Sequence, residues 1–204
     1  MDVLITAGAT RNPIDAVRYL SAASSGRTGV TLARALVDRG HDVWLLGSPE
    51  ARLRGPEVPG EEYGSTRDLM ARMEVWVREH PGGAVVHACA VGDYEADPDA
   101  SKIPSGRETL QITLRPTPKI ADHVRAWGLS GPYVTFKAAP PETTEAELEG
   151  IARRQRERTG CDLVFANVLG RLSSLVLLVG EGTRRFHDRQ AAIEALTRWL
   201  DPFE

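Results

Sequence analysis

The chain opens with Val3-Leu4-Ile5-Thr6-Ala7-Gly8-Ala9-Thr10-Arg11, and Ser24-Ser25-Gly26-Arg27-Thr28-Gly29 follows after a polar loop. The first piece predicts an apolar strand that ends in small residues, which leaves backbone amides open to a ligand. The second piece predicts the start of a helix, where unpaired N–H groups and the positive end of the helix dipole favour an anion. One glycine of this kind usually serves only to permit a tight turn. Two such turns in one opening βα unit favour a nucleotide or phosphate site.

The composition indicates an ordinary globular protein. Its 204 residues suffice for one domain with a full core and are too few for two large ones, so we expect residues 1–204 to form a single nucleotide-binding domain. Hydrophobic residues make up 42% and charged residues 26%, which excludes disordered and fibrous classes. The net charge of −3 offers no basic excess for a phosphate backbone, which disfavours nucleic-acid binding.

Two cysteines and the amino-terminal residues bear on the compartment. Cys89 and Cys161 lie in apolar runs and are interpreted as buried free thiols of a reducing compartment. The start, Met1-Asp2-Val3, lacks a basic leader region, and no apolar run approaches the length of a membrane span. We therefore expect a cytoplasmic protein without membrane contact.

Strand and helix signals alternate along the chain. We expect strands at 2–6, 42–47, 84–88, 133–136 and 163–166, and a hairpin at 174–186. We expect helices at 27–39, 66–79, 118–127, 142–158 and 189–200, and a loop at 48–64. This alternation predicts a doubly wound, mostly parallel, Rossmann-like α/β sheet with right-handed crossovers.

The alternation is interrupted at about 93–117, where Asp, Pro, Gly and Ser cluster. Within this segment Leu110-Gln-Ile-Thr-Leu114 alternates apolar and polar residues, which predicts a half-buried hairpin strand outside the main sheet. We interpret the segment as a β-hairpin or flap insertion that carries Lys102.

The loops that follow the parallel strands should form one rim, because ligands of such sheets bind beyond the carboxyl ends of the strands. These loops are Ala7–Arg11, Ala88–Tyr94, Phe136–Pro140 and the position of Asn167. We expect one cleft there, lined by Gly8, Gly26, Asp93, Phe136 and Asn167.

Each polar candidate also has a structural interpretation. The carboxylate of Asp93 could accept from a base or sugar or bind a metal, and an Asx-turn explains it equally well. Lys102 alone is more often a solvated charge, and Arg154 and Arg158, four residues apart on one helix face, favour a solvated face. His87 lies in an apolar strand, which favours a core histidine, and Asn167 could simply cap a strand end.

Other chemistries have weak support. The histidines show no metal-ligand spacing with the cysteines, and we expect no protein metal site. No nucleophile motif of the Gly-x-Ser-x-Gly kind occurs, and no Gly-x-Gly-x-x-Gly follows the first strand. Tyr133-x-x-x-Lys137 has the spacing of short-chain reductases, but those enzymes place the pair on a helix and this segment predicts a strand. A nicotinamide reductase is thus disfavoured.

Seven motifs occur in the order of a known family. They are residues 3–18, Ser24-Ser25-Gly26, Ala90-Val-Gly-Asp-Tyr94, Lys102-Ile103, Thr117-Pro118-Lys119-Ile120, Phe136-Lys137 and Asp162-Leu-Val-Phe-Ala-Asn167. Over nearly its whole length the chain resembles phosphopantothenate–cysteine ligases, which act in coenzyme A synthesis. It looks most like the stand-alone bacterial form, which lacks a fused flavin decarboxylase.

The resemblance implies a two-step ligation. A nucleoside triphosphate, CTP in most bacteria and ATP in eukaryotes, converts 4′-phosphopantothenate to an acyl nucleotidylate, and the cysteine amine then displaces the nucleotide. The triphosphate would carry Mg²⁺, because the crowded negative charge needs cations and amides around it. The resemblance also implies a homodimer, in which hairpin and flap reach the neighbouring subunit.

The family's site residues are carried over by position. The flap lysine Lys102 would neutralise phosphate charge and is the expected catalytic residue. The expected nucleotide-binding residues are Ala88, Cys89, Ala90, Asp93, Lys102, Thr117, Pro118, Lys119, Ile120, Phe136, Arg154 and Arg158. The expected phosphate- or substrate-binding residues are Gly8, Thr10, Arg11, Ala22, Ser24, Ser25, Gly26 and Asn167.

The chain departs from the family at one signature residue. Family members usually read Ser-Asn-His-Ser-Ser/Thr-Gly, with the asparagine at the reacting acyl group, where this chain has Ser21-Ala22-Ala23-Ser24-Ser25-Gly26. The flap is thin at Lys102-Ile103-Pro104-Ser105, and Val168 stands where aspartate is common. An alternative function therefore stays open: a degenerate member that binds nucleotide or phosphopantothenate without ligating, or that joins another acid and amine.

Overall fold

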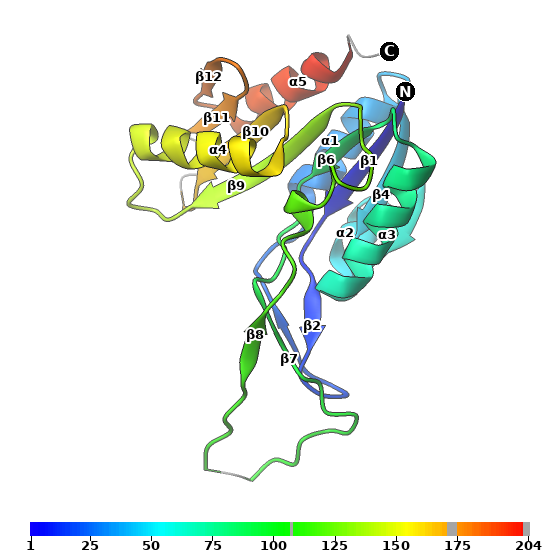
Figure 1. Ribbon diagram of the computed structural model, residues 1–204, viewed down its shortest axis with the longest axis vertical. Coiled ribbons are helices and arrows are strands. Elements are labelled where there is room, and N and C mark those ends of the chain that lie inside the picture. Colours follow the sequence, from blue (N-terminus) through cyan, green and yellow to red (C-terminus); the bar gives the residue numbers. More distant parts are fainter. Residues whose placement is uncertain (107, 171–174, 202–204) are drawn as a thin grey trace.

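The computed structural model describes residues 1–106, 108–170 and 175–201. Its body is one eight-stranded sheet in the order β12-β11-β10-β9-β6-β1-β4-β5 (Figure 1). The strands are β1 (Asp2–Ala7), β4 (Asp42–Gly47), β5 (Gly60–Glu62), β6 (Ala84–His87), β9 (Tyr133–Ala139), β10 (Leu163–Val168), β11 (Val176–Val179) and β12 (Thr183–Phe186). Neighbours from β5 to β10 pair in parallel, and the two hairpin strands β11 and β12 add antiparallel at the edge. The predicted doubly wound, mostly parallel α/β sheet is confirmed.

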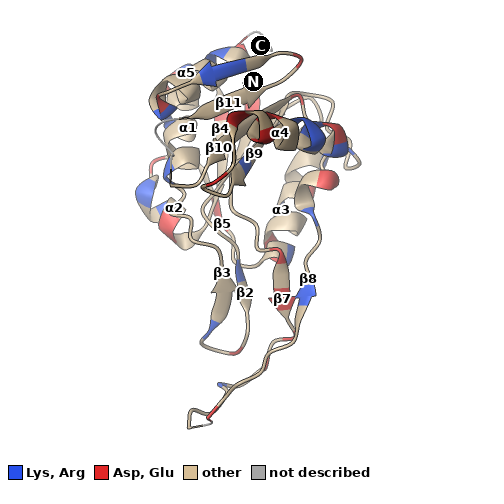
Figure 2. Ribbon diagram, turned by 90° about the vertical axis from the view of Figure 1, so that its left-hand side faces the viewer, with Lys and Arg blue, Asp and Glu red and all other residues tan. Residues whose placement is uncertain are grey.

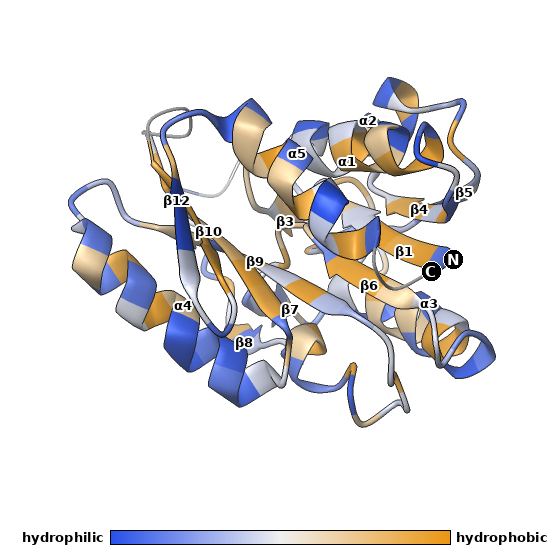
Figure 3. Ribbon diagram, turned by 90° about the horizontal axis from the view of Figure 1, so that it is seen from above, coloured by the Kyte–Doolittle hydropathy of each residue, from blue (hydrophilic) through white to orange (hydrophobic). Residues whose placement is uncertain are grey.

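Helices cover both faces of the sheet, as Figure 3 shows from above. One face packs against α1 (Arg27–Val37), α2 (Pro49–Arg54) and α5 (Arg189–Leu200). The other packs against α3 (Thr66–Glu79), the 3₁₀ turn η1 (Ile120–Asp122) and α4 (Glu145–Thr159). Because both faces are covered, the central strands are nearly continuous apolar runs, and all six residues of β10 are buried.

Helix starts follow from local sequence, with one exception. The side chains of Ser48, Ser65, Thr144 and Asp188 cap the helices that follow them, and Thr144 forms a reciprocal capping box with Glu147. Helix α1 instead begins after Gly26, at φ 72°, without a side-chain cap. Its first backbone amides are therefore left for another partner.

Two antiparallel ribbons leave the body beside the carboxyl ends of the central strands and project away from it (Figures 1 and 2). One pairs β2 (Arg11–Pro13) with β3 (Tyr19–Ser21), and the other pairs β7 (Tyr94–Ala96) with β8 (Leu114–Pro116). The Asn12 side-chain amide donates to the Tyr94 carbonyl at 2.8 Å and joins the ribbons. We call residues 11–21 together with the described residues of 94–116 the arm.

The structure corrects several local predictions. The segment at 48–64 holds α2 and β5, since Ser48 caps a helix that Pro49 can begin. The polar loop expected after Arg11 is the β2–β3 hairpin. The helix expected at 118–127 shrinks to η1 and turns, because Lys119 has a non-helical ψ of 87°.

The alternating stretch 110–114 is also mostly outside the ribbon. Only Leu114 pairs, and Leu110 and Ile112 are 44% and 39% exposed rather than half-buried in a strand. The alternation lacks a sheet face to pack on, so it does not become a strand. At the carboxyl-terminal hairpin, the expected residue 174 lies outside the described residues. In the described part of the chain no helix is long and apolar enough to cross a membrane.

Candidate functional site

The two predicted glycine turns touch each other. Gly8 has φ 94° and Gly26 has φ 72°, conformations that side chains rarely adopt. A Cβ on Gly26 would lie 2.5 Å from Ala51 Cβ and 3.0 Å from the Gly8 nitrogen, and a Cβ on Gly8 would lie 2.0 Å from Ser48 Oγ. Only glycine therefore lets the end of β1 and the start of α1 approach so closely.

The segment after β6 lies alongside the first turn. The Ala90 nitrogen donates to the Gly8 carbonyl at 2.8 Å, and the Thr10 nitrogen donates to the Ala90 carbonyl at 3.1 Å. The Gly92 nitrogen donates to Thr10 Oγ1 at 2.8 Å. We call residues 7–10, 24–27 and 88–93 the cradle.

The cradle favours an anion because of its backbone. Helix α1 starts there without a side-chain cap and has no acidic residue in its first turn. The nearby guanidinium of Arg11 forms an ion pair with Glu50, and Arg54 donates to the Ser25 carbonyl at 3.2 Å. The open amides and the dipole of α1 would therefore attract an anion such as a phosphate group.

Two polar side chains at the cradle are neutral, the buried His87 and Cys89, which is half-buried rather than fully buried as expected. Thr6 Oγ1 lies 3.0 Å from His87 Nδ1 and accepts from the Cys89 nitrogen at 3.2 Å. Burial lowers the pKa of His87 to about 4 and raises the pKa of the Cys89 thiol to about 11. Neither side chain carries charge near pH 7, so neither supplies an electrostatic attraction for an anion. His87 matches the core-histidine interpretation.

The predicted segment 117–120 borders the cradle. Thr117 Oγ1 donates to the Gly92 carbonyl at 2.6 Å, and the Thr117 nitrogen donates to the Asp93 carbonyl at 3.0 Å. The exposed side chains of Lys119 and Asp93 form an ion pair. Ile120 is 1% exposed and packs in the core, and Pro118, between Thr117 and Lys119, is half-buried. The carboxylate of Asp93 thus lies at the edge with a cation beside it.

An aromatic pair follows along the rim. Phe136 stacks on Phe165 with ring centroids 4.6 Å apart, and the guanidinium of Arg189 lies 5.1 Å from the Phe165 centroid. Arg189 also donates to Thr28 Oγ1 at 3.0 Å, which connects α5 to the first turn of α1. Sequence reasoning missed Phe165 and Arg189, since no local pattern distinguishes an arginine at a helix start.

Two buried donors at this rim have no partner among the described residues. They are Asn167 Nδ2 at the end of β10 and Arg189 Nη1. A buried donor without a partner costs free energy, which a ligand that accepts a hydrogen bond would recover. The Asn167 amide can therefore donate to a ligand that accepts a hydrogen bond.

Other expected residues lie outside the cradle as defined above. Arg154 and Arg158 are exposed on α4, and Arg158 pairs with Asp122. Ala22 is exposed in the linker between β3 and α1, where its carbonyl accepts from the Ser24 nitrogen at 3.1 Å. Lys102 is exposed on the arm, within the loop between β7 and β8 that extends away from the sheet (Figure 1).

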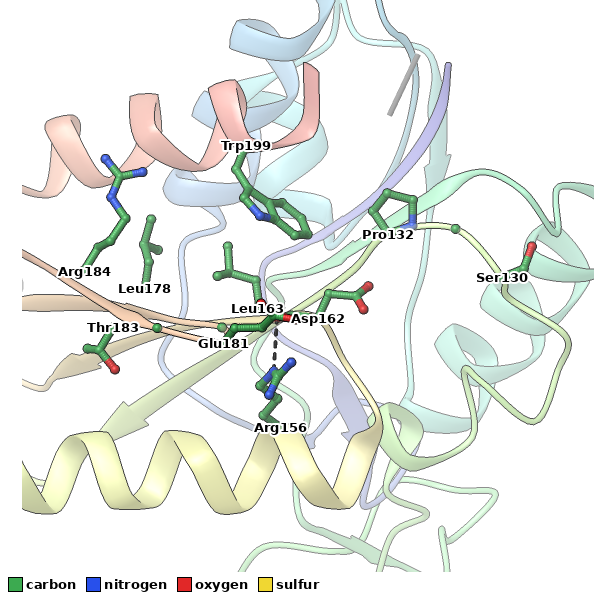
Figure 4. A pocket seen from close by; sticks show the side chains of 13 residues that line it. Ser130, Pro132, Arg156, Asp162, Leu163, Leu178, Glu181, Thr183, Arg184 and Trp199 are labelled. Carbon is green, nitrogen blue, oxygen red and sulfur yellow. Dashed lines mark hydrogen bonds between the residues drawn. The ribbon is translucent and has the colours of Figure 1, made fainter. Parts of the chain in front are cut away.

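Two hollows lie away from the cradle. One of about 580 Å³ lies at the amino ends of β9 and β10, where Arg156 donates to the Asp162 carbonyl at 3.2 Å and Trp199 overhangs (Figure 4). Another of about 640 Å³ lies between α3 and β4 and includes Trp44 and Trp76. In the described ranges no group of three or more His, Cys, Asp or Glu side chains could hold a metal ion.

Fold and site together define a doubly wound α/β domain with an anion-favouring cradle at the carboxyl ends of its strands and a projecting arm. The chain belongs to the DNA/pantothenate metabolism flavoprotein C-terminal domain family, whose sequence model matches residues 1–177.

Three relatives illustrate the match. The chain is 37% identical, over 213 residues, to the coenzyme A biosynthesis bifunctional protein CoaBC of Thermococcus kodakarensis, and the match covers 99% of this chain and 50% of that protein. The chain thus spans half the length of this curated relative. The DNA/pantothenate metabolism flavoprotein of Streptococcus pneumoniae superposes with a TM-score of 0.90 at 25% identity over 100% of both chains. A Cab2 mutant in complex with phosphopantothenate-cysteine shares the fold, with a TM-score of 0.80 at 18% identity over 99% of this chain and 87% of that one.

Proposed function

We propose that this chain is a phosphopantothenate–cysteine ligase of coenzyme A biosynthesis. The observation that carries the proposal is the uncapped start of α1 against the Gly8 turn, an anion site at the carboxyl ends of the strands. The CoaBC relative supports the pathway, and the Cab2 complex supports the product class.

In the proposed reaction a carboxylate oxygen of 4′-phosphopantothenate attacks the α-phosphorus of CTP or ATP. The bond to the β-phosphate breaks and pyrophosphate leaves with Mg²⁺, which the triphosphate carries. The cysteine amine then attacks the acyl carbon, the amide bond forms, and the nucleoside monophosphate leaves with the electron pair of the acyl–oxygen bond. The amine loses its proton in this step.

The cradle and its rim would bind the nucleotide. Backbone amides at Gly8 and Gly26 would donate to phosphate oxygens, and the helix dipole of α1 would add to the attraction. The Ala90 nitrogen donates to the Gly8 carbonyl and so holds the Gly8 turn in place. Phe136 and Asp93 would frame base and ribose. Lys102 would supply the cation that neutralises charge developing on the phosphates.

A homodimer is part of the proposal. Six of the ten large apolar side chains that are exposed in the described residues belong to the arm, namely Val17, Tyr19, Tyr94, Leu110, Ile112 and Leu114. Apolar groups gathered on a projecting element mark a contact surface. A second copy would cover this surface and receive Lys102 at its own cradle.

The test is a pyrophosphate-release assay with 4′-phosphopantothenate and CTP or ATP, with and without cysteine. The proposal predicts release that requires phosphopantothenate, a preference for one triphosphate, and one amide formed per pyrophosphate when cysteine is present. Absence of calorimetric binding of either triphosphate would contradict it.

One specific observation favours a second candidate, a binding module without ligation. Ala22 stands where the resembled family has an asparagine that can donate a hydrogen bond, and its exposed methyl group cannot. Under this alternative the triphosphate binds, yet neither pyrophosphate nor amide appears. The same assay therefore separates the two functions.

A further inference from the structure

We infer that Asp15 is a positioning residue that fastens the Lys102 segment of the arm to the β2–β3 hairpin. The inference rests on the proposed ligase function for its kinetic consequence. Asp15 belongs to none of the binding groups described above, yet its side chain is 0% exposed in a hairpin turn whose next four residues are exposed. A buried carboxylate in so exposed an element needs a reason.

Donors from two distant segments converge on this carboxylate. Oδ1 accepts from the backbone nitrogens of Val17 at 2.9 Å and Arg18 at 2.8 Å. Oδ2 accepts from Arg18 Nη1 at 2.7 Å and from the backbone nitrogen of Ile103 at 3.1 Å. The first three bonds shape the hairpin turn, and the fourth crosses to the residue directly after Lys102.

A second set of bonds fixes the same segment. The Asp99 nitrogen donates to the Ile14 carbonyl at 3.0 Å, and Arg18 Nη1 donates to the Ile103 carbonyl at 3.3 Å. The backbone is therefore fastened to the hairpin on both sides of Lys102, whose side chain stays exposed. The β7–β8 pairing lies outside this segment, so these bonds determine where Lys102 is presented.

The negative charge of Asp15 suits this task. Burial alone would raise the pKa of its carboxyl, but hydrogen bonds from the backbone nitrogens of Val17, Ile103 and Arg18, with the Arg18 charge, hold it below its ordinary value. Asp15 therefore stays ionised at neutral pH and accepts charge-assisted bonds. An asparagine of the same shape would turn an amide donor toward one of these donors.

The kinetic test is a double-mutant cycle in the full chain with Asp15→Asn and Lys102→Ala. Misplacing a reacting group by about 1 Å can cost 10²-fold, so Asp15→Asn should lower kcat at least tenfold and leave the triphosphate KM within twofold. The double variant should be no slower than Lys102→Ala alone, since both changes remove the same contribution. The matched control is Asp97→Asn, because Asp97 is an exposed carboxylate of the arm that pairs with Arg115. This variant should leave kcat unchanged.

A measurement independent of activity separates this inference from the ligase proposal. Hydrogen exchange of the Ile103 amide should speed up at least tenfold in Asp15→Asn and stay unchanged in Asp97→Asn. Should Asp15→Asn fail to fold, Ile103→Pro removes the crossing donor and leaves the Asp15 side chain in place, and it should give the same loss of kcat. Unchanged exchange at Ile103, or losses that multiply in the double variant, would overturn the positioning role. A wild-type chain without turnover but with Asp15-dependent exchange would contradict the ligase proposal alone.

Discussion

The cradle and the arm are built on opposite principles. The cradle is made mainly of backbone groups, glycines and small side chains, with the exposed carboxylate of Asp93 at its edge, and it is held by the sheet. The arm carries exposed cations and apolar groups, and a few side-chain hydrogen bonds such as those of Asp15 hold it. A site that only binds phosphate needs rigid amides, whereas a cation that must approach after binding needs a movable carrier. Under the proposed function, this difference assigns triphosphate affinity to the cradle and turnover to the arm.

The largest effect is expected in the cradle from Gly26→Ala. The new Cβ would lie 2.5 Å from Ala51 Cβ, so the turn must shift and calorimetry should detect no triphosphate binding. Gly40→Ala is the matched control, because its φ is 87° and no heavy atom lies within 4 Å of the new Cβ. Both variants share the left-handed strain, about 1–2 kcal/mol. Equal triphosphate affinity in the two variants would break the assignment of affinity to the cradle.

The next largest effect is a gain in ligation rate from Ala22→Asn, at the junction between arm and cradle. One positioned donor is typically worth ~10²–10³ in rate, so ligation should rise by that order while triphosphate affinity stays within twofold. Ala23→Asn, at the exposed neighbouring position, should give no gain. A wild-type rate already in the ordinary range of ~1–10³ s⁻¹ would make Ala22 a tolerated substitution and exclude the binding-module alternative.

Lys102→Ala changes only the arm and should lower turnover by well over tenfold. The side chain is exposed, so the melting temperature should stay nearly constant, and calorimetry should give an unchanged triphosphate affinity. Arg115→Ala removes another exposed cation of the arm and should preserve turnover. If Lys102→Ala turns over normally, Lys102 is only a solvated charge.

The smallest effect concerns pH. The pKa of His87 is lowered from 6.5 to about 4 by burial, so below pH 6.5 the unfolded chain binds a proton that the folded chain does not. The contribution of His87 to the free energy of unfolding should therefore fall by about 1 kcal/mol between pH 7.5 and 5.5 and level off below pH 4. Urea unfolding of wild type and of His87→Gln at several pH values checks this. The variant should lack the part of the pH dependence of the unfolding free energy that His87 contributes.

The same pH range should separate the behaviour of the arm from that of the sheet that holds the cradle. The pKa of Asp15 lies below its ordinary value, so the carboxylate stays charged from pH 7.5 to 5.5. Exchange at Ile103, corrected for its intrinsic pH dependence, should then stay constant while the body loses stability. Parallel loss in both regions would mean that arm and cradle open together.

The sequence was informative where periodic burial and caps act locally. The alternation of strands and helices, the cap at Thr144 and the two glycine turns were all predictable, because each depends on neighbouring residues. The helix expected at 118–127 was wrong, since the backbone of Lys119 is set by contacts of Thr117 with residues 92–93.

Part of the candidate site could not be predicted from the sequence, because it depends on contacts between residues far apart in the chain. The stack of Arg189 on Phe165 joins α5 to a strand, and the bond from Ile103 to Asp15 spans 88 positions. Such pairs are determined by topology, which a single sequence does not reveal. The placement of the glycine turns against the segment after β6 could be predicted because parallel strands end at one edge.

Under the proposed function, the cradle of one copy and the arm of the other complete one site, and subunit mixing tests this arrangement most directly. Asp93→Ala damages the cradle edge and Lys102→Ala damages the arm, so each homodimer should be nearly inactive. Co-expression with distinct tags forms mixed dimers in which one of two sites is intact, and about a quarter of wild-type turnover should return in the unsorted mixture. Recovery to that level is the predicted result. If purified mixed dimers stay as inactive as either parent, the arm acts on its own cradle and the claim is contradicted.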